Sequence, residues 1–346
     1  MRRKSKGFSS EEGKKALFWK ALKNKNVQCR LCPRYCMIKD GGRGNCGVRK
    51  NIKGKLFSIV YGKPCSVGID PIEKKPFYHF LPGRKAFSIA TAGCNLHCMY
   101  CQNWKISQCM PENVPSLNMP PEKVVLGARY EDAKIISYTY TEPTVFYEYM
   151  LDTAKLAIKK KMRNTLVSNG FINSEPLEKL APLIEAANID LKGDNDFYKK
   201  VTGAWIEPVL ETLKELKKAG VWIEITNLVI PTLNDSRQQI QWLAKWIYDN
   251  LGSDTPLHFS AFWPTYKLSK LPQTSIEKLK EARKIAINQG LNYVYTGNLP
   301  DDIGNNTYCP KCHALVIRRS GFYVMENRMI NGKCHSCKTK IAGVWK

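Results

Sequence analysis

The sequence predicts an α/β fold, a full or partial parallel β/α barrel with a cysteine-rich module before it and a zinc ribbon after it. Two observations predict this fold. Between about residues 86 and 300, short apolar runs alternate with helical patterns, which is typical of parallel strands joined by crossover helices, in a barrel or a doubly wound sheet. Outside that region, cysteines gather in groups among Gly and Pro. We therefore divide the 346 residues into three units, 1–83, 84–300 and 301–346.

The composition is that of an ordinary globular protein. Hydrophobic residues make up 43% of the chain and charged residues 24%, which excludes disordered, collagen-like and coiled-coil proteins. No stretch approaches the roughly 18 apolar residues of a membrane span. The basic start of the chain is not followed by the apolar run of a secretory signal. We expect a cytoplasmic protein with no membrane association.

The net charge of +24 lies mainly at the two ends of the chain. Residues 1–85 hold 22 basic and 5 acidic residues, residues 301–346 hold 8 and 3, and the middle is near neutral. Such ends could bind nucleic acid, an acidic partner or a phosphorylated substrate. They could instead be solvated basic surface. We favour this second interpretation, because net charge indicates association and not a particular chemistry.

The elements follow in order along the chain. The first unit begins with an amphipathic pattern that predicts a helix over Glu11–Lys23, and continues in turns and short strands. In the middle unit we expect strands at 86–93, 134–140, 164–170, 186–193, 221–230, 256–262 and 292–297, and helices at 142–161, 175–184, 205–219, 236–250 and 275–289. Nearly every strand ends in polar residues. This pattern favours the barrel, because barrel active sites are built at the C-terminal ends of the strands.

Three cysteines follow the first of these strands, as Cys94-x3-Cys98-x2-Cys101. A disulfide framework is not expected among thirteen cysteines without an export signal. Structural zinc takes four ligands, whereas three close thiolates suit a 4Fe-4S cluster with one iron left open. That iron could bind the amino and carboxylate groups of a methionine moiety. Alternatively, Cys109 or His97 supplies a fourth ligand and the cluster only carries electrons.

The motif CNLHCMYC has the spacing of the radical S-adenosylmethionine (SAM) superfamily, which it resembles. The middle unit is similar to the pyruvate formate-lyase-activating-enzyme branch. The whole chain from residue 27 to 346 resembles the radical SAM enzymes of the AmmeMemoRadiSam system. The matching stretches are CRLCPRYCMIKDGGRGNCGVR, VGIDPIEKKPFYHFLPG, YTYTEPTVF, NIDLKG, YKKVTG, LVIPTLND and YCPKCH…CHSCKTKIAGVW.

The resemblance implies a 4Fe-4S cluster on Cys94, Cys98 and Cys101, with SAM as the second cofactor. It places Tyr100 near the adenine and makes Glu142 the acceptor for the methionine amine, although Tyr140 and Thr141 stand where the family usually has two glycines. Further residues match positions that line SAM or the substrate end of the barrel: Ser168, Asn169, Asp190, Lys192, Asn227 and His258. Asp190 and Lys192 could instead form a salt bridge across the barrel mouth.

The last unit carries Cys309-x2-Cys312 and Cys334-x2-Cys337, the paired pattern of a zinc ribbon, with a strand-rich run at 314–327 between them. A small tail of this kind needs a metal to fold. The motif CPKCH also matches c-type haem attachment, but that chemistry needs an exported chain and leaves the second pair unexplained.

A further set of four cysteines lies in the first unit: Cys29, Cys32, Cys36 and Cys46. Four thiolates can hold zinc or a second, fully ligated 4Fe-4S cluster. The pattern favours a structural metal. Of the remaining cysteines, Cys65 is expected to be a buried thiol.

We therefore expect a radical SAM enzyme, in which an electron from a flavodoxin- or ferredoxin-like protein drives the cleavage of SAM. The resulting 5′-deoxyadenosyl radical would take a hydrogen atom from an unidentified substrate. A small molecule or modified residue handled with the other AmmeMemoRadiSam proteins is favoured over a glycine of a partner polypeptide, and RNA comes third. The competing hypothesis is a metal-bearing protein that binds nucleic acid and catalyses nothing.

Overall fold

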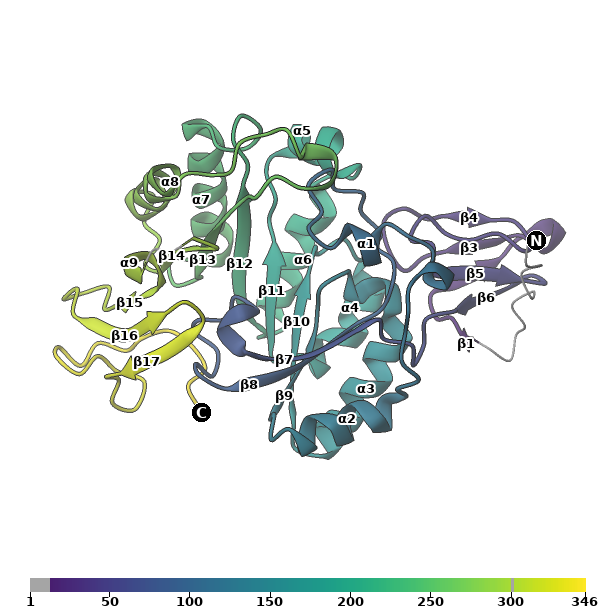
Figure 1. Cartoon of the computed structure of the whole chain (residues 1–346), viewed down its shortest axis with the longest axis horizontal. Helices are drawn as coiled ribbons and strands as arrows, with labels where there is room; N and C mark the ends of the chain where they lie inside the picture. Colours follow the sequence, from purple (N-terminus) through teal and green to yellow (C-terminus); the bar gives the residue numbers. More distant parts are fainter. Residues whose placement is uncertain (1–12, 300–301) are drawn as a thin grey trace.

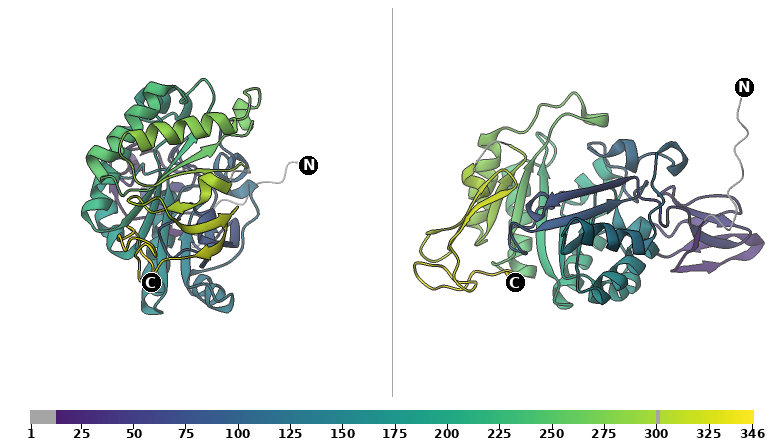
Figure 2. Two further views of the ribbon diagram at one scale, coloured as in Figure 1. Left: turned by 90° about the vertical axis from the view of Figure 1, so that its left-hand side faces the viewer. Right: turned by 60° about the horizontal axis from the view of Figure 1, so that its bottom comes forward.

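The computed structural model describes residues 13–299 and 302–346. The central sheet and its helices lie between two small modules, which sit at opposite ends of the molecule (Figure 1, purple and yellow). A view from a second direction shows the same separation (Figure 2).

The N-terminal module consists of two three-stranded antiparallel sheets. One has the order β1-β6-β5 and the other β2-β3-β4. The strands are β1 (Lys14–Lys15), β2 (Trp19–Ala21), β3 (Val27–Cys29), β4 (Met37–Ile38), β5 (Arg49–Ile52) and β6 (Lys55–Ser58), with a short helix η2 (Lys23–Lys25) after β2.

The helix predicted over Glu11–Lys23 is wrong for the described residues of that range, and residues 11–12 lie outside them. Phe18 takes a positive φ of 51°, and Trp19–Ala21 pairs as a strand with Val27–Cys29. Of the apolar residues in the pattern, Ala16 is buried, Trp19 and Leu22 are half-buried and Leu17 is exposed. Strand pairing within the module overrides the local helical preference.

The central sheet has eight strands in the order β14-β13-β12-β11-β10-β9-β8-β7. Its strands are β7 (Ser66–Pro71), β8 (Lys85–Ala90), β9 (Ile135–Tyr138), β10 (Arg163–Ser168), β11 (Ala186–Asp190), β12 (Trp222–Val229), β13 (Leu257–Ala261) and β14 (Val294–Gly297). All seven predicted strands are present as β8–β14 and are parallel to one another. β7 lies inside the range given to the first unit and is antiparallel to β8. The order runs without reversal, so the sheet is an open barrel and not a doubly wound sheet.

The crossover helices are α2 (Pro121–Tyr130), α3 (Tyr147–Lys159), α4 (Ser174–Leu180), α6 (Glu207–Lys218), α7 (Arg237–Leu251) and α8 (Ile276–Asn288). Shorter helical turns are η3 (Ile72–Lys74), α1 (Trp104–Ser107), η4 (Pro111–Asn113), η5 (Pro143–Phe146), η6 (Ala181–Leu183), α5 (Asn195–Phe197), η7 (Tyr198–Thr202) and η8 (Tyr266–Leu268). The five predicted helices are confirmed within a few residues, and α2 was not predicted. Among the described residues, no helix has the length and apolarity needed to span a membrane.

The C-terminal module contains α9 (Asp302–Asn305), β15 (Thr307–Tyr308), β16 (Leu315–Ser320) and β17 (Tyr323–Asn327). It seals the end of the barrel where the parallel strands begin. Arg319 is buried there and donates hydrogen bonds to the carbonyl of Tyr78 and the hydroxyl of Thr307, both at 2.8 Å. The backbone N–H of Val344 donates to the carbonyl of His79 at 2.7 Å. The module is therefore the floor of the barrel.

Candidate active site

A cavity of about 280 Å³ opens at the C-terminal ends of the parallel strands. The loop after β8 contributes the three close cysteines to its wall, and residues within or just after β9, β10, β11, β12 and β13 complete it. Its polar lining includes Tyr100, Thr139, Tyr140, Thr141, Ser168, Asn169, Asp190, Lys192, Thr226 and Ser260. This is the place where the parallel barrel topology predicts a site.

The thiols of Cys94, Cys98 and Cys101 all line this cavity. The backbone N–H of Leu96 donates to Cys94 Sγ at 3.4 Å, and Ser107 Oγ lies 3.1 Å from Cys101 Sγ. Burial raises the pKa of Cys98 to about 11, although the nearby Lys192 charge acts in the opposite direction. Three thiols on one wall, with hydrogen-bond donors and a cation beside them, fit an iron–sulfur cluster.

Neither candidate for a fourth protein ligand reaches the three thiols. Cys109 Sγ donates to the carbonyl oxygen of Lys105 at 3.0 Å, and Cys109 does not line the cavity. His97 is engaged outside the cavity, with 2.7 Å contacts to Gln108 Oε1 and Asn45 Oδ1. The arrangement therefore fits a cluster held by three cysteines.

Five of the residues predicted to contact SAM line the cavity: Tyr100, Ser168, Asn169, Asp190 and Lys192. Lys192 Nζ lies 2.7 Å from Asp190 Oδ2, so the alternative of a salt bridge at the mouth is also present. The same ammonium lies 5.9 Å from the centre of the Tyr100 ring. One cation, one carboxylate and neutral hydrogen-bonding groups thus line the same cavity as the thiols.

Glu142 lies directly beneath this wall and is not part of the cavity lining. Its Oε1 accepts hydrogen bonds from the Thr144 N–H (2.9 Å) and Ser168 Oγ (2.8 Å), and its Oε2 accepts one from the Asn169 N–H (2.8 Å). The carboxyl group is fully buried, and burial raises its pKa. In this structure Glu142 therefore positions the loops after β9 and β10.

Two predicted site residues, Asn227 and His258, lie outside the cavity. Neighbouring strand residues face opposite sides, and Thr226 and Leu228 face the cavity, so Asn227 faces away and donates to the Leu191 carbonyl at 2.7 Å. His258 is near the start of β13, in the floor. Its Nε2 lies 2.6 Å from Glu224 Oε2.

The sequence analysis missed a polar group at the rim of the cavity. Lys75 Nζ donates to Asp70 Oδ2 (2.7 Å) and to the Tyr140 hydroxyl (2.8 Å), and that hydroxyl donates to Asp70 at 2.7 Å. Burial acts to raise the pKa of Asp70, but hydrogen bonds from Lys74, Lys75 and Tyr140 lower it to about 2. The available signal was the paired lysines of DPIEKKP, in a stretch that matched the family.

Tyr140 has a positive φ of 66°. By the resemblance to the family, this position usually holds glycine, which adopts a left-handed conformation easily. Here the contacts of the Tyr140 hydroxyl with Asp70 and Lys75 stabilise the same conformation in a tyrosine.

The N-terminal module packs against the loop that carries the three cysteines. Arg34 donates hydrogen bonds to the carbonyls of Asn95 and Gly203, the latter at 2.8 Å. A side chain on Gly93 would come within 2.6 Å of the Cys46 carbonyl oxygen. The two cysteine sets therefore lie in neighbouring, directly contacting loops.

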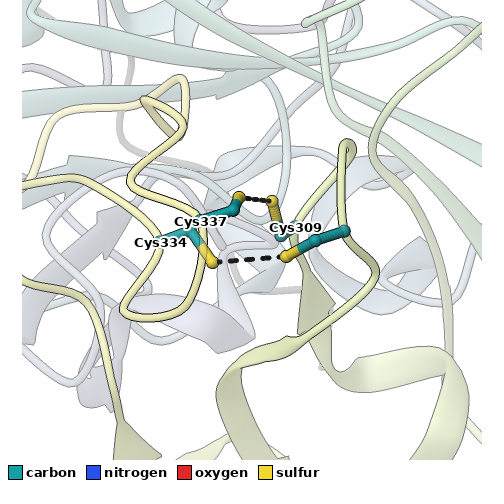
Figure 3. A group of neighbouring side chains, drawn as sticks. Cys309, Cys334 and Cys337 are labelled. Atoms are coloured by element: carbon teal, nitrogen blue, oxygen red, sulfur yellow. Dashed lines mark hydrogen bonds between the residues drawn. The ribbon is translucent and has the colours of Figure 1, made fainter.

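A separate metal-binding geometry is present in the C-terminal module (Figure 3). The sulfurs of Cys309, Cys312, Cys334 and Cys337 all lie within 4.8 Å of one another. Cys309 and Cys337 are 3.5 Å apart, and Cys312 and Cys334 are 3.7 Å apart. Four thiols at this spacing fit a zinc module.

Comparisons with known proteins agree with this geometry. The uncharacterized protein MJ0808 of Methanocaldococcus jannaschii is 48% identical over 330 residues, which are 95% of this chain and 98% of that protein. The pyruvate formate-lyase-activating enzyme of Clostridium pasteurianum is 28% identical over 160 residues, 44% of this chain and 65% of the enzyme.

Among solved structures, a radical SAM methyltransferase from Sphaerobacter thermophilus is similar in fold, with a TM-score of 0.50 and 16% identity over 64% of this chain and 68% of that chain. A profile of the radical SAM superfamily matches residues 88–244, which include the three-cysteine loop and the strands around the cavity. With its parallel open barrel and its three cysteines in one cavity wall, the chain contains a radical SAM domain with homology to pyruvate formate-lyase-activating enzyme.

Proposed function

We propose that this protein uses a 4Fe-4S cluster on Cys94, Cys98 and Cys101 to cleave SAM reductively and to take a hydrogen atom from a substrate. The observation that carries the proposal is the set of three thiols in one cavity wall, with Cys109 and His97 both engaged elsewhere. A cluster with an open iron, when bound together with SAM, supplies the electron that releases methionine and a 5′-deoxyadenosyl radical.

In this proposal, the residues of the chain bind and orient the cluster and the cofactor. Asn169 Nδ2 lies 3.8 Å from Cys94 Sγ and donates to Asn95 Oδ1 at 2.9 Å, so it fixes the loop beside the first sulfur. Lys192 and Asp190 offer opposite charges for the carboxylate and amine or the hydroxyls of the cofactor. Tyr100 and the apolar side chains of Val167 and Leu228 form a wall that limits water around the reacting carbon.

Members of this superfamily generally use an external electron donor. For this chain we propose a flavodoxin- or ferredoxin-like protein in that role. We also propose that the C-terminal thiols hold zinc, whose four-coordinate preference matches their spacing.

The experiment that tests the proposal is anaerobic reconstitution, followed by SAM and dithionite and chromatography for 5′-deoxyadenosine. Wild type should form it, and Cys98→Ala should form none. Cys109→Ala is the matched control, because its thiol bonds to the Lys105 carbonyl outside the cavity, and it should match wild type. Equal product from Cys98→Ala and wild type would refute the proposal, and loss of product in Cys109→Ala would refute the three-ligand assignment.

For the substrate, we propose a small molecule or modified residue handled with the other proteins of the AmmeMemoRadiSam system. What supports this is the match of motifs in both flanking modules as well as in the barrel, from residue 27 to 346. Turnover with deuterated candidate substrates tests it, because the label enters deoxyadenosine only from the molecule that loses hydrogen.

A second candidate target is a glycine of a partner polypeptide. It is favoured by two relatives: the Clostridium pasteurianum enzyme, and a putative glycyl-radical enzyme activating enzyme of Methanocaldococcus jannaschii, which is 27% identical over 218 residues. Label transfer from a glycine-deuterated partner protein, and none from small molecules, would favour this target over the first.

A further inference from the structure

The four cysteines of the N-terminal module, Cys29, Cys32, Cys36 and Cys46, converge on one place. Cys29 ends β3, and Cys32 and Cys36 follow in the turn before β4. The Cys29 N–H donates to the Cys36 carbonyl at 2.9 Å, which closes that turn. Burial raises the pKa of Cys32, and the nearby thiols of Cys29, Cys46 and Cys36 raise it further, which places all four side chains close together. All four thiols are free.

The surroundings of these sulfurs are those of metal-bound thiolates. The Asn45 N–H donates to Cys36 Sγ at 3.4 Å, the same contact that Leu96 makes with Cys94 in the barrel. Backbone N–H groups also face the sulfurs of Cys32 and Cys46, from Arg34 and from Val48 and Arg49. Such hydrogen bonds stabilise negative charge on sulfur and tune the bound metal.

A buried cation lies beside the set. The side chain of Arg49 is 1% exposed, and its charge acts on both Cys29 and Cys46. Its Nη1 lies 2.9 Å from the Glu148 carboxylate and its Nη2 donates to the Leu17 carbonyl, but its Nε has no hydrogen-bond partner among the described residues. This remaining buried N–H is accounted for if the neighbouring thiolates carry net negative charge, as they do around a metal centre.

The spacing of the sulfurs distinguishes one ion from a cluster. Four thiolates on one zinc, with Zn–S distances of about 2.3 Å, lie about 3.8 Å apart in a tetrahedron. The C-terminal set has this spacing, with 3.5 and 3.7 Å between its sulfurs. Among the described residues, the C-terminal set is the one group of three or more such side chains whose ligand atoms gather closely enough to hold a single metal ion, and neither the N-terminal set nor Cys94, Cys98 and Cys101 forms such a group. In this respect the N-terminal set resembles the barrel set and differs from the zinc set.

We propose that Cys29, Cys32, Cys36 and Cys46 hold a second iron–sulfur cluster with four protein ligands, and not the structural zinc that the sequence pattern favours. Four thiolates bound to four different irons lie farther apart than four bound to one ion. This agrees with the contrast between the N-terminal and C-terminal sets. The Cys46 carbonyl faces Gly93, the residue before Cys94, so the second redox centre lies beside the first.

The test separates the second site from the first by removing the first. The full chain with Cys94, Cys98 and Cys101 all changed to Ala keeps the N-terminal module intact and is reconstituted anaerobically with iron and sulfide. It should hold about four iron atoms and one zinc per chain, against about eight iron atoms and one zinc for wild type. Because these counts do not involve SAM cleavage, they stand apart from the test of the proposed function.

Two further arms make the result decisive. Adding Cys29→Ala and Cys32→Ala to the triple variant should abolish the remaining iron, whereas adding Cys109→Ala should leave it. The reduced triple variant should give an electron paramagnetic resonance signal that SAM does not alter, because all four irons are protein-ligated. A triple variant with about two zinc atoms and no iron would overturn the proposal. So would residual iron that survives loss of Cys29 and Cys32, which marks adventitious binding.

Discussion

Gly93 offers the sharpest test of how the N-terminal module holds the three-cysteine loop. It has a φ of +95°, and an added Cβ would lie 2.6 Å from both the Cys46 carbonyl oxygen and Val48 Cγ1. Gly252 provides a matched control, because it has a φ of +91° and no atom within 4 Å of an added Cβ. Comparing Gly93→Ala with Gly252→Ala therefore isolates the cost of the close approach from the cost of the backbone conformation.

The magnitudes follow from these two environments. At Gly252, where φ is 91° and ψ is 161°, the backbone conformation is one that L-residues rarely adopt and costs an alanine about 1–3 kcal/mol, and the stiffer unfolded chain returns about 0.4–1 kcal/mol of it. Gly252→Ala should therefore lower the free energy of unfolding by about 1 kcal/mol. Gly93→Ala adds an overpacking cost of about 1–3 kcal/mol, because a backbone carbonyl cannot rotate away as a side chain can. Its total loss should be about 2–4 kcal/mol.

Two measurements check this prediction. Anaerobic denaturant unfolding of the reconstituted chains should give a lower midpoint for Gly93→Ala than for Gly252→Ala. The rate of 5′-deoxyadenosine formation should fall about 100-fold in Gly93→Ala only, since a displacement of roughly 1 Å near the reacting groups can cost that much. Equal midpoints and equal rates for the two variants would refute the described packing of the module against the loop.

Three further predictions concern buried charge, pH and metal. Glu148→Gln removes the carboxylate that pairs with the almost fully buried Arg49 guanidinium at 2.9 Å, so unfolding measurements should show a loss of about 3–5 kcal/mol. Asp249→Asn breaks an exposed ion pair with Lys245 and should cost less than about 1 kcal/mol. Similar losses in the two variants would contradict the argument. Burial lowers the pKa of His79 to about 4, below its unfolded value of about 6.5, so folding stability should be complete above pH 6.5 and fall by about 3 kcal/mol as the pH drops to 4. His79→Gln should flatten that dependence, and a wild-type midpoint constant over the interval would be the contrary result. Cys312→Ser should lose the zinc, and with it hydrogen-exchange protection in β15–β17, at unchanged iron content; full zinc retention would argue against the site.

The strands and most crossover helices could be predicted, because parallel strands are buried on both faces and therefore consist of continuous apolar runs. The conformation of the opening segment could not be predicted from the sequence. Its apolar residues recur at helical spacing, but antiparallel pairing of Trp19–Ala21 with β3 decides the conformation, and that pairing depends on residues distant in sequence. Helix α2 was missed because two consecutive prolines, its N-cap Pro120 and its first residue Pro121, resemble a loop in the sequence.

The site was predicted in outline, because polar residues at strand ends converge in a barrel. Asn227 and His258 lie outside the cavity for two different reasons. Asn227 faces away from the cavity because the register of β12 turns Thr226 and Leu228 toward it. His258 lies near the start of β13, at the opposite end of the strand from the cavity. The group formed by Asp70, Lys75 and Tyr140 joins β7, the turn after it and the loop after β9, and only the antiparallel edge strand brings these together.

The floor of the barrel also constrains when the protein can finish folding. The backbone of Val344 bonds to both His79 and Leu81, and Arg319 bonds to Tyr78, so partners more than 200 residues apart close this end. A ribosome delivers Tyr78–Leu81 more than 200 residues before Arg319 and Val344. The barrel therefore stays unsealed until these partners have been synthesised, and a nascent chain stalled before residue 319 would expose the aromatic side chains of its floor to chaperones.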